Sequence, residues 1–447
     1  MTHSAPSHIF HRNARQTPPR ASHAAGIWIT DTGGRRYLDA CGGAAVSCLG
    51  HGDPEVVAAI ANQAARLAYV HTSFFTTDAA EDLANLLIAG APEGIARAYF
   101  LCDGSEAVET ALKMAHQYHR ERGEPDRCHI IAREQSYHGN TLGALSAGGN
   151  ALRRATYQGV MLPSTSHIAP CWDYRLRLPG ETPEAYGRRA ADLLEAEILR
   201  VGPGRVSCFI AETVVGATLG CVPPAPGYFA RIREICDRHG VLLILDEVMC
   251  GMGRTGTLHA CEAEAVRPDI LVVAKGLGAG YVPLGAVLCS QQVFDAFAEG
   301  SGGFVHGHTF VGHPVACAAA LAVQRAVQSR GLVAQSQARG CDLRAGLEAA
   351  LGGHRSVGDI RGRGLFQAVE FVADRGTKAP FDAAAKINAR IRQAAMDRGL
   401  LVYAMAGTLD GRTGDHILLA PPFITTPDDI ALIVDLLAAA VTDALPS

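Results

Sequence analysis

Lys275 stands where an apolar segment meets a glycine-rich one, in the stretch DILVVAKGLGAG at residues 269–280. Lysine is scarce in this chain, because the 40 basic residues include only Lys113, Lys275, Lys378 and Lys386. Burial disfavours an ammonium ion, so the pKa of such a lysine falls and its neutral amine becomes a nucleophile. A surface lysine that lays its stem over apolar residues is commoner in general. The flanks here leave no obvious solvated face, and we predict a nucleophilic lysine.

Asp246 ends the apolar run VLLILDE at residues 241–247. An aspartate at the end of a buried strand can hold magnesium beside a nucleotide, but that arrangement requires a G-x-x-x-x-G-K-[ST] loop, and the sequence has no Gly-Lys dipeptide. The remaining functional interpretation is a buried carboxylate that faces a cation or a protonated ring nitrogen. An ordinary helix N-cap is the structural alternative.

Two further stretches could bind an anion. In DGSEAVETALK (103–113), Gly104 and Ser105 open a predicted helix, whose first N–H groups and dipole favour negative charge. The alternative is an ordinary N-cap with an acidic first turn. In HGHTFVGHP (306–314), Thr309 could donate to an anion, although this stretch alone is not specific.

Short apolar runs alternate with helical patterns through the middle of the chain and must position these residues. Runs of this length between helices are typical of strands buried on both faces of a mainly parallel sheet. The predicted strands are 96–102, 128–134, 206–212, 241–247 and 269–275. Ligands of such α/β folds bind beyond the carboxyl ends of the strands. The residues that follow the runs include Gly104, Ser105, Tyr137, His138, Glu212, Asp246 and Lys275.

The pattern changes after about residue 315, where a long alanine-rich helix leads to helices and strands of a smaller α+β unit. The stretch GIWITDTGGRRYLDA near the N-terminus has the alternation and Gly-Gly of a hairpin and could join that unit. The first 25 residues are predicted to form an extended arm. We expect residues 1–64 to form this arm and part of a small domain, 65–330 a large domain, and 331–447 the rest of the small domain.

The composition excludes several classes of function. The chain has 447 residues, 48% of them hydrophobic, a net charge of -4 and 13 cysteines without a Cys-x-x-Cys pair. Nucleic acid is therefore not an expected partner, and no apolar stretch is long enough for a membrane span. The N-terminus lacks the apolar region of a secretory signal, so we expect a cytoplasmic protein. No His-Glu-x-x-His motif or cysteine–histidine cluster predicts a metal site.

Seven stretches in this order resemble the class III (omega-type) aminotransferases, a pyridoxal-phosphate family of the aspartate-aminotransferase fold. The resemblance runs from near residue 26 to beyond residue 420, and it implies fold type I with a mainly parallel large domain and an α+β small domain. The matching stretches are YLDACGGAAVSCLGHGDPEVVAAI, FLCDGSEAVETALKMA, SYHG, LILDEVMCGMGRTG, AKGLGAGYVPLGAVL, HTFVGHPVACAAALA and VGDIRGRGLF.

The resemblance implies roles for residues around the cofactor ring. Lys275 would form the covalent link with the cofactor's aldehyde and then move a proton as general base and acid. Asp246 would pair with the pyridinium nitrogen and keep the ring an electron sink. Tyr137 would stack on one face of the ring and Val248 would pack on the other.

The resemblance also implies how the phosphate is held. Gly104 and Ser105 would bind it through the helix N-terminus, and Thr309 would reach it from the neighbouring subunit. His138 and Glu212 complete the expected cofactor-binding set. A homodimer with active sites at the subunit interface, alone or within a tetramer, is the expected assembly.

Two departures bear on the substrate. Family members that use ornithine or 4-aminobutyrate with 2-oxoglutarate carry a glutamate and an arginine where this sequence has Ala217 and Leu418. Apolar residues at both positions resemble the amine:pyruvate group, which implies an amine donor without a carboxylate and a small keto acid acceptor. Arg412, in the loop AMAGTLDGRTGDH, could bind the acceptor's carboxylate, with an exposed loop arginine as the alternative. Phe74 is a further predicted substrate contact.

The motifs leave the reaction partly open. Mutases, epimerases and a decarboxylating transaminase share this fold and keep the lysine and the aspartate. A scaffold that has lost catalysis is a third interpretation, but each expected cofactor position holds a competent residue. One more departure is Thr213, where the family usually has proline.

Overall fold

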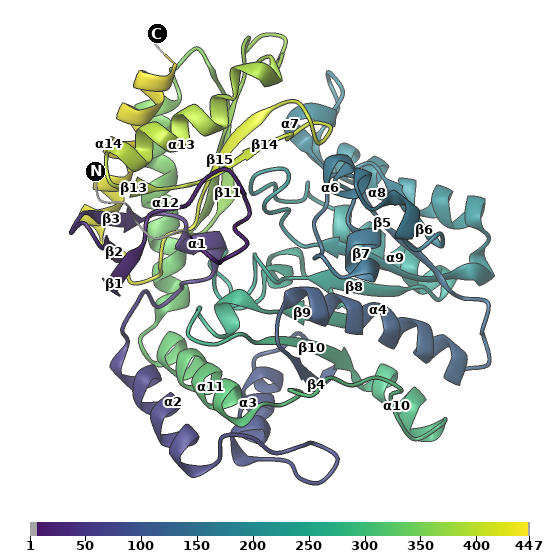
Figure 1. Ribbon diagram of the computed structural model, residues 1–447. Helices are drawn as coiled ribbons and strands as arrows, with labels where there is room; N and C mark the ends of the chain where they lie inside the picture. Colours follow the sequence, from purple (N-terminus) through teal and green to yellow (C-terminus); the bar gives the residue numbers. More distant parts are fainter. Residues whose placement is uncertain (1–6, 446–447) are drawn as a thin grey trace.

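The computed structural model describes residues 7–445, and a seven-stranded sheet lies at its centre (Figure 1). The strands, in spatial order, are β4 (Ile95–Leu101), β10 (Gly285–Ser290), β9 (Ile270–Val273), β8 (Leu242–Asp246), β7 (Val206–Glu212), β5 (His129–Arg133) and β6 (Thr165–Ile168). From β9 to β6 all neighbours are parallel, whereas β10 runs antiparallel to both β4 and β9. The expected α/β fold with a mainly parallel sheet is confirmed.

The inner strands β7, β8 and β9 are buried on both faces, as their apolar runs predict. The helices around this sheet are α3 (Asp78–Ala89), α4 (Gly104–Glu121), α8 (Pro183–Val201), α9 (Tyr228–His239), α10 (Gln291–Glu299) and α11 (Pro314–Ser329). Alternate residues of β8 point to opposite layers: Leu243 and Leu245 pack with helices α8 and α9, and Leu242 and Ile244 pack with α4. The core therefore fixes each strand end, and with it the residues that follow.

Two strands of this sheet were not predicted. β6 has the sequence TSHI, only its last residue is buried, and it lies at the edge of the sheet. β10 is buried along most of its length, but its short run follows the glycine-rich segment after Lys275 and has no helical pattern before it. Because β10 is antiparallel to its neighbours, no crossover helix has to precede it. The alternation of apolar runs with helical patterns therefore does not predict it.

Two four-stranded sheets complete the structure. One has the order β1 (Ala21–Ala25), β2 (Trp28–Asp31), β3 (Arg36–Asp39) and β13 (Leu400–Leu401), and the other β11 (Val357–Arg363), β12 (Phe366–Phe371), β15 (Asp415–Leu419) and β14 (Tyr403–Ala406). The N-terminal hairpin is confirmed by the antiparallel pairing of β2 with β3. The last part of the predicted extended arm instead forms β1, while residues 1–6 of that arm lie outside the described residues.

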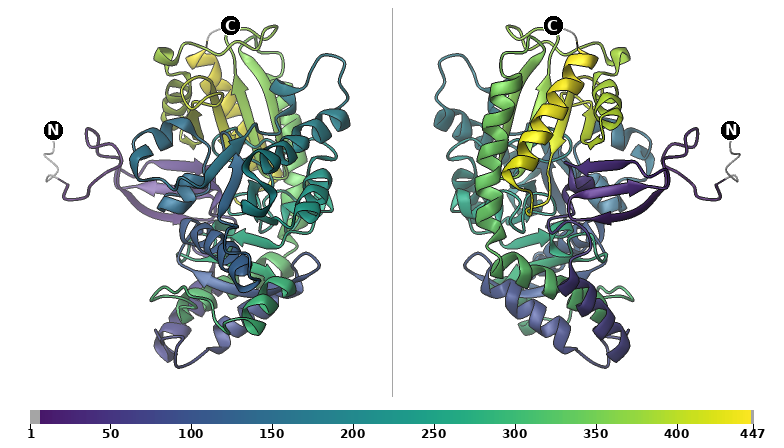
Figure 2. Two further views of the ribbon diagram at one scale, coloured as in Figure 1. Left: turned by 90° about the vertical axis from the view of Figure 1, so that its right-hand side faces the viewer. Right: turned by 90° about the vertical axis from the view of Figure 1, so that its left-hand side faces the viewer.

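The two ends of the chain share one apolar core. Strand β13 pairs in parallel with β3, and Leu38 of β3 lies in a cluster with Leu400 of β13 and Leu437 of α14. Figure 2 shows α12 (Leu332–Leu351, green) beside α14 (Pro427–Ala444, yellow), with α13 (Ile387–Asp397) nearby and the purple N-terminal strands projecting from the same part of the molecule. This shared core agrees with the expected small unit, and the boundaries at residues 64 and 330 stay a prediction.

Between residues 7 and 445, no helix is long and apolar enough to cross a membrane. The apolar C-terminal helix α14 is amphipathic, because it buries one row of aliphatic residues in the shared core and exposes its acidic first turn.

Candidate active site

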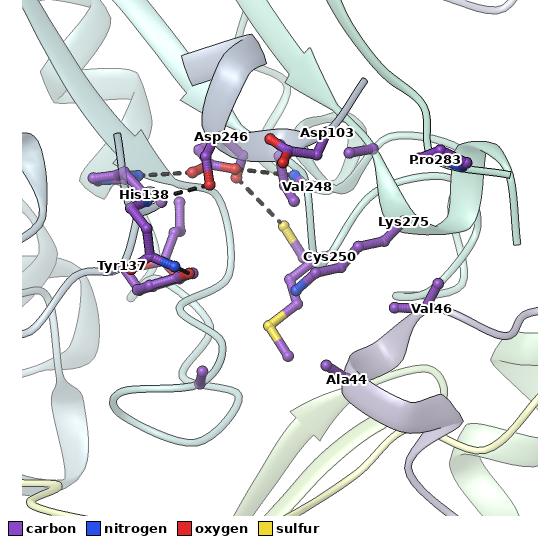
Figure 3. Close-up of a pocket in the computed structure, with 18 of the residues that line it drawn as sticks. Ala44, Val46, Asp103, Tyr137, His138, Asp246, Val248, Cys250, Lys275 and Pro283 are labelled. Atoms are coloured by element: carbon purple, nitrogen blue, oxygen red, sulfur yellow. Dashed lines mark hydrogen bonds and ion pairs between the residues drawn. The ribbon is translucent and has the colours of Figure 1, made fainter. Parts of the chain in front are cut away.

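A cavity of about 630 Å³ lies beyond the carboxyl ends of the central strands (Figure 3). It brings together most of the residues selected from the sequence, although they come from five different strand ends. Those that line it are Gly104, Ser105, Tyr137, His138, Glu212, Ala217, Asp246, Val248 and Lys275. The sheet thus places them at one edge, where α/β folds bind their ligands.

Lys275 follows β9 and begins a short 3₁₀ turn, Lys275–Leu277. Its side chain is half-buried and lines the cavity, so Lys275 is not a solvated surface lysine. Burial lowers the pKa of Lys275 to about 8, although the negative charges of Asp246 and Glu212 oppose this effect. Its φ of 44° lies in the left-handed region, which few non-glycine residues adopt. The backbone is therefore held in a strained conformation where the amine meets the cavity.

Asp246 is the last residue of β8 and is buried. Its Oδ2 lies 2.7 Å from Nδ1 of His138, and its Oδ1 accepts a hydrogen bond of 3.0 Å from the backbone N–H of Val248. A turn follows Asp246, so the alternative of a helix N-cap is wrong. Nε2 of His138 is buried without a hydrogen-bond partner among the described residues. A carboxylate has about four acceptor sites, so Asp246 can take a further proton donor from the cavity.

Glu212 is buried at the end of the neighbouring strand β7. It accepts the backbone N–H of Tyr137 at 3.3 Å and that of Gly216 at 3.1 Å. Burial raises its pKa despite the nearby His138. The phenol of Tyr137 accepts a hydrogen bond of 3.1 Å from Nδ2 of Asn140, so both the backbone and the ring tip of Tyr137 are fixed at the cavity wall.

The N-terminus of α4 opens into the cavity. Asp103 accepts the N–H of Glu106 at 2.9 Å, so the N-cap interpretation of this stretch is confirmed. The N–H groups of Gly104 and Ser105 precede the capped one and have no intrahelical acceptor. A Cβ on Gly104 would lie 2.8 Å from Cγ1 of Val248. The capped helix therefore still presents two N–H groups in a recess that only glycine leaves open.

A second glycine keeps the loop of Tyr137 close to α4. Gly139 has a φ of 133°, and a Cβ there would lie 2.8 Å from the Cα of Ser105. The Oγ of Ser105 accepts the N–H of Asn140 at 3.2 Å across this contact. The loop and the helix N-terminus thus form one wall of the cavity.

Four predicted residues do not line this cavity. Thr309 is exposed and its carbonyl accepts a hydrogen bond from the hydroxyl of Tyr69, Phe74 is 78% exposed, and Arg412 is exposed beside Asp410. Leu418 is buried behind the lining, in an apolar cluster with Ala217 and Met249. Their proposed roles stay predictions.

The cavity also contains residues that the sequence did not single out. Arg153 lies in α6 (Ala151–Ala155), and its guanidinium carbon is 4.7 Å from the ring centre of Tyr137. Arg12 and Tyr403 line the same cavity. Tyr403 begins β14 of the small unit, whose strands the sequence predicts, whereas Arg12 and Arg153 come from segments without a strand-end signal.

Thr213, which stands where the family usually has proline, has a hydrogen-bond partner. Its hydroxyl donates to Oε1 of the buried Glu247 at 2.9 Å, a bond that proline cannot make. Glu247 also accepts the N–H groups of Ala260 and Cys261. Threonine in place of proline therefore supplies a third hydrogen-bond donor to the carboxylate of Glu247, the residue that follows Asp246.

Comparison with known families identifies the family of this chain. The sequence profile of the family Aminotransferase class-III matches residues 9–441. The chain belongs to this family. Class III aminotransferases depend on pyridoxal phosphate.

Other aminotransferases match over most of their length. An uncharacterised aminotransferase of Schizosaccharomyces pombe is 46% identical over 98% of this chain and 95% of its own. Gamma aminobutyrate transaminase 3 of Solanum lycopersicum is 36% identical over 91% of this chain and 77% of its own. The solved structure of an amine transaminase from an uncultivated Pseudomonas species, in its pyridoxal-phosphate-bound form, is 37% identical with a TM-score of 0.91 over 99% of both chains. The resemblance read from the motifs is confirmed.

The residues of the cavity fit pyridoxal phosphate. The phosphate suits the recess at Gly104, where two helix N–H groups and the dipole favour an anion. The buried carboxylate of Asp246 suits a protonated ring nitrogen, and the amine of Lys275 suits an aldehyde. Acidic, basic and anion-binding groups thus occur together in one recess.

Proposed function

We propose that this class III aminotransferase binds pyridoxal phosphate in the described cavity and transfers the amino group of a primary amine to a small keto acid such as pyruvate. The observation that carries the proposal is the position of Lys275, which is half-buried at the cavity with its pKa lowered to about 8. Apolar residues at positions 217 and 418 support the choice of substrates.

The chain's own residues divide the binding of the cofactor. Gly104 and Ser105 hold the phosphate, and Tyr137 and Val248 hold the two faces of the ring. Asp246 keeps a proton on the ring nitrogen, and His138 fixes the carboxylate through its 2.7 Å contact. When bound, pyridoxal phosphate supplies an aldehyde for amines and a ring that accepts the electrons of the breaking C–H bond.

Lys275 acts as the proton carrier. Its neutral Nζ would remove the proton from the carbon that bears the donor's nitrogen, and the ring of the bound cofactor would take up the electron pair of that C–H bond. In the return half-reaction the protonated Nζ would deliver a proton to the carbon that bore the acceptor's carbonyl oxygen, with the electron pair supplied by the ring. A pKa near 8 suits both directions, because the group gains and loses a proton readily near neutral pH.

The substrate side of the cavity supports a donor without a carboxylate. Ala217 is buried, and the apolar cluster around it includes Val214, Met249 and Leu418. A donor carboxylate against these residues would be buried without a partner. An uncharged alkyl or aryl group fits them, as in the amine transaminases.

Borohydride trapping followed by peptide mass spectrometry tests the cofactor site. We expect the reduced cofactor on the peptide that contains Lys275, and no such label in Lys275→Ala. Labelling of Lys275→Ala elsewhere with activity retained would contradict the proposal.

A panel of amines, with pyruvate or 2-oxoglutarate as acceptor, tests the reaction. We expect amine alone to convert the bound cofactor to pyridoxamine phosphate and pyruvate to restore it. An epimerase or a mutase would return to its starting spectrum without an acceptor, so that result would favour the alternative reactions on this fold.

The proposal includes a homodimer in which Thr309 reaches the phosphate of the neighbouring site. Thr309 is exposed and does not line the cavity of its own chain, which suits a contact made across an interface. A cytoplasmic location is likewise a prediction that rests on the sequence.

A further inference from the structure

Arg153 presents a positive charge to the cavity without an acidic partner. It lies in α6, lines the same cavity as Lys275, and is half-buried. Its guanidinium carbon lies over the ring of Tyr137 at 4.7 Å. Within residues 7–445, no carboxylate lies within ion-pair distance of it. The contact with a neutral ring leaves the charge of Arg153 without a counter-ion.

The carboxylates that line the cavity are already occupied by other donors. Asp103 caps the N–H of Glu106, and Glu212 accepts two backbone N–H groups. Asp246 accepts the N–H of Val248 and contacts His138. These contacts fix each carboxylate in its present place, and none of the three lies within ion-pair distance of Arg153. A ligand anion in the cavity can neutralise Arg153 without moving any of them.

The other arginines near the cavity are less suitable. Arg154, the next residue, does not line the cavity and places Nη1 3.3 Å from Nδ1 of His167. Arg12 lines the cavity but is exposed, and Arg412 is exposed and outside the lining. Arg153 alone among these four combines partial burial, a fixed neighbour in Tyr137 and a place in the cavity wall.

We propose that Arg153 binds the carboxylate of the keto acid acceptor and thereby restricts this enzyme's acceptors to carboxylic acids. This inference rests on the proposed function and deepens it. A guanidinium presents paired N–H groups that match both oxygens of a carboxylate. Its stacking on Tyr137 places that carboxylate beside the residue proposed to hold the cofactor ring. An uncharged donor makes no use of this contact, so one cavity serves both substrates. It does so although Ala217 and Leu418 replace the glutamate and the arginine that other family members carry at these positions.

The test compares Arg153→Gln with the wild type in separate half-reactions of the holoenzyme. We expect the kcat/KM for pyruvate to fall about 10- to 100-fold, because a charge-assisted bond is lost. We expect the half-reaction with an uncharged amine and the affinity for pyridoxal phosphate to change less than about threefold. Competitive inhibition by propionate, a carboxylate that cannot react, should weaken in parallel. Arg153→Lys keeps the charge and should recover part of the loss for pyruvate.

Matched arginine variants identify the residue responsible. Arg154→Gln is the control and should leave the KM for pyruvate unchanged. If Arg12→Gln or Arg412→Gln weakened pyruvate instead, and Arg153→Gln did not, the assignment to Arg153 would be overturned. A loss of pyridoxal phosphate affinity in Arg153→Gln with an unchanged KM for pyruvate would assign the arginine to the cofactor phosphate and also overturn it. If the wild type transferred no amino group to any keto acid, the proposed function itself would be wrong. If the wild type were active and Arg153→Gln had the same kcat/KM for pyruvate, only the assignment to Arg153 would be wrong.

Discussion

At the scale of single residues, the role that we propose for Lys275 depends on how the fold sets its charge. Burial favours its neutral amine, while Asp246 and Glu212 favour its ammonium form, and burial prevails. With a pKa of about 8, a substantial fraction of Lys275 is neutral near physiological pH, whereas an ordinary lysine with a value of 10.5 is almost wholly charged. The carboxylate of Asp246, which we propose to hold the ring nitrogen, thus also limits how far the pKa of Lys275 falls.

The pH dependence of cofactor attachment tests this balance. Because the neutral amine is the nucleophile, the rate at which cofactor-free protein bonds to pyridoxal phosphate should rise with pH and level off above about 8. In Asp246→Asn the charge that raises the pKa of Lys275 is gone, so the midpoint should move to lower pH. Stopped-flow absorbance measures both profiles. A midpoint near 10.5 in the wild type, or an upward shift in Asp246→Asn, would contradict the prediction.

At the scale of elements, the sequence predicted the strands whose ends carry the chemistry. Each of the five predicted strands has a counterpart in the central sheet, because a buried parallel strand needs an uninterrupted apolar run. The polar edge strand β6 and the antiparallel β10 lack that signal or its context. Strands were therefore predictable where they are buried, apolar and set between helices. They were not predictable where hydrogen bonds to a neighbouring strand define them, because those bonds leave no pattern in the sequence.

The candidate site was predictable to the same extent. Lys275, Asp246 and Glu212 follow buried strands, so the topology brings them together. Arg153 reaches the cavity from a short helix in the connection between β5 and β6, and Arg12 reaches it from the N-terminal segment. No local pattern encodes such approaches, since they depend on how loops pack in three dimensions.

The recess at the start of α4 makes a prediction for Gly104→Ala. The added Cβ would lie 2.8 Å from Val248, so the helix N-terminus or the valine must shift. We expect overpacking of about 1–3 kcal/mol, seen as roughly 5- to 150-fold weakening of pyridoxal phosphate binding. Equilibrium dialysis measures the affinity. Gly204→Ala is the control, because its Cβ would meet nothing within 4 Å, and its affinity should match the wild type. Unchanged binding in Gly104→Ala would show that the recess is not the phosphate site.

The hydrogen bond between Thr213, which follows β7, and Glu247, which follows β8, makes a prediction for Thr213→Val. This change removes the donor to the buried Glu247 but keeps the side chain's shape, so the free energy of unfolding should fall by about 1.5–3 kcal/mol. Urea unfolding of the cofactor-free protein measures it. Thr442→Val removes an exposed helical hydroxyl bonded only to the carbonyl of Ala438, and should change stability by less than about 0.5 kcal/mol. Equal effects of the two variants would mean that Glu247 does not need its third donor.

At the scale of the whole molecule, the exposed side chains around Thr309 suggest a second copy of the chain. Phe310 and Tyr69 make an edge-to-face contact, and the hydroxyl of Tyr69 donates to the carbonyl of Thr309. Phe74 and Val305 are 78% and 82% exposed in the same two segments of the chain. Exposed apolar residues that gather in this way are typical of protein interfaces. A homodimer would cover them and carry Thr309 toward the partner's phosphate recess.

Complementation between two inactive variants tests that arrangement. Lys275→Ala lacks the proposed proton carrier, and Thr309→Val, assayed at limiting pyridoxal phosphate, lacks the proposed phosphate donor. If Thr309 serves the neighbouring site, a mixed dimer has one intact site, formed by Lys275 of one chain and Thr309 of the other. Random exchange of subunits should then restore about a quarter of the wild-type activity, because half of the dimers are mixed and each has one working site of two. If Thr309 served its own chain, no mixed dimer would contain an intact site, and the activity of the mixture would stay at the average of the two variants.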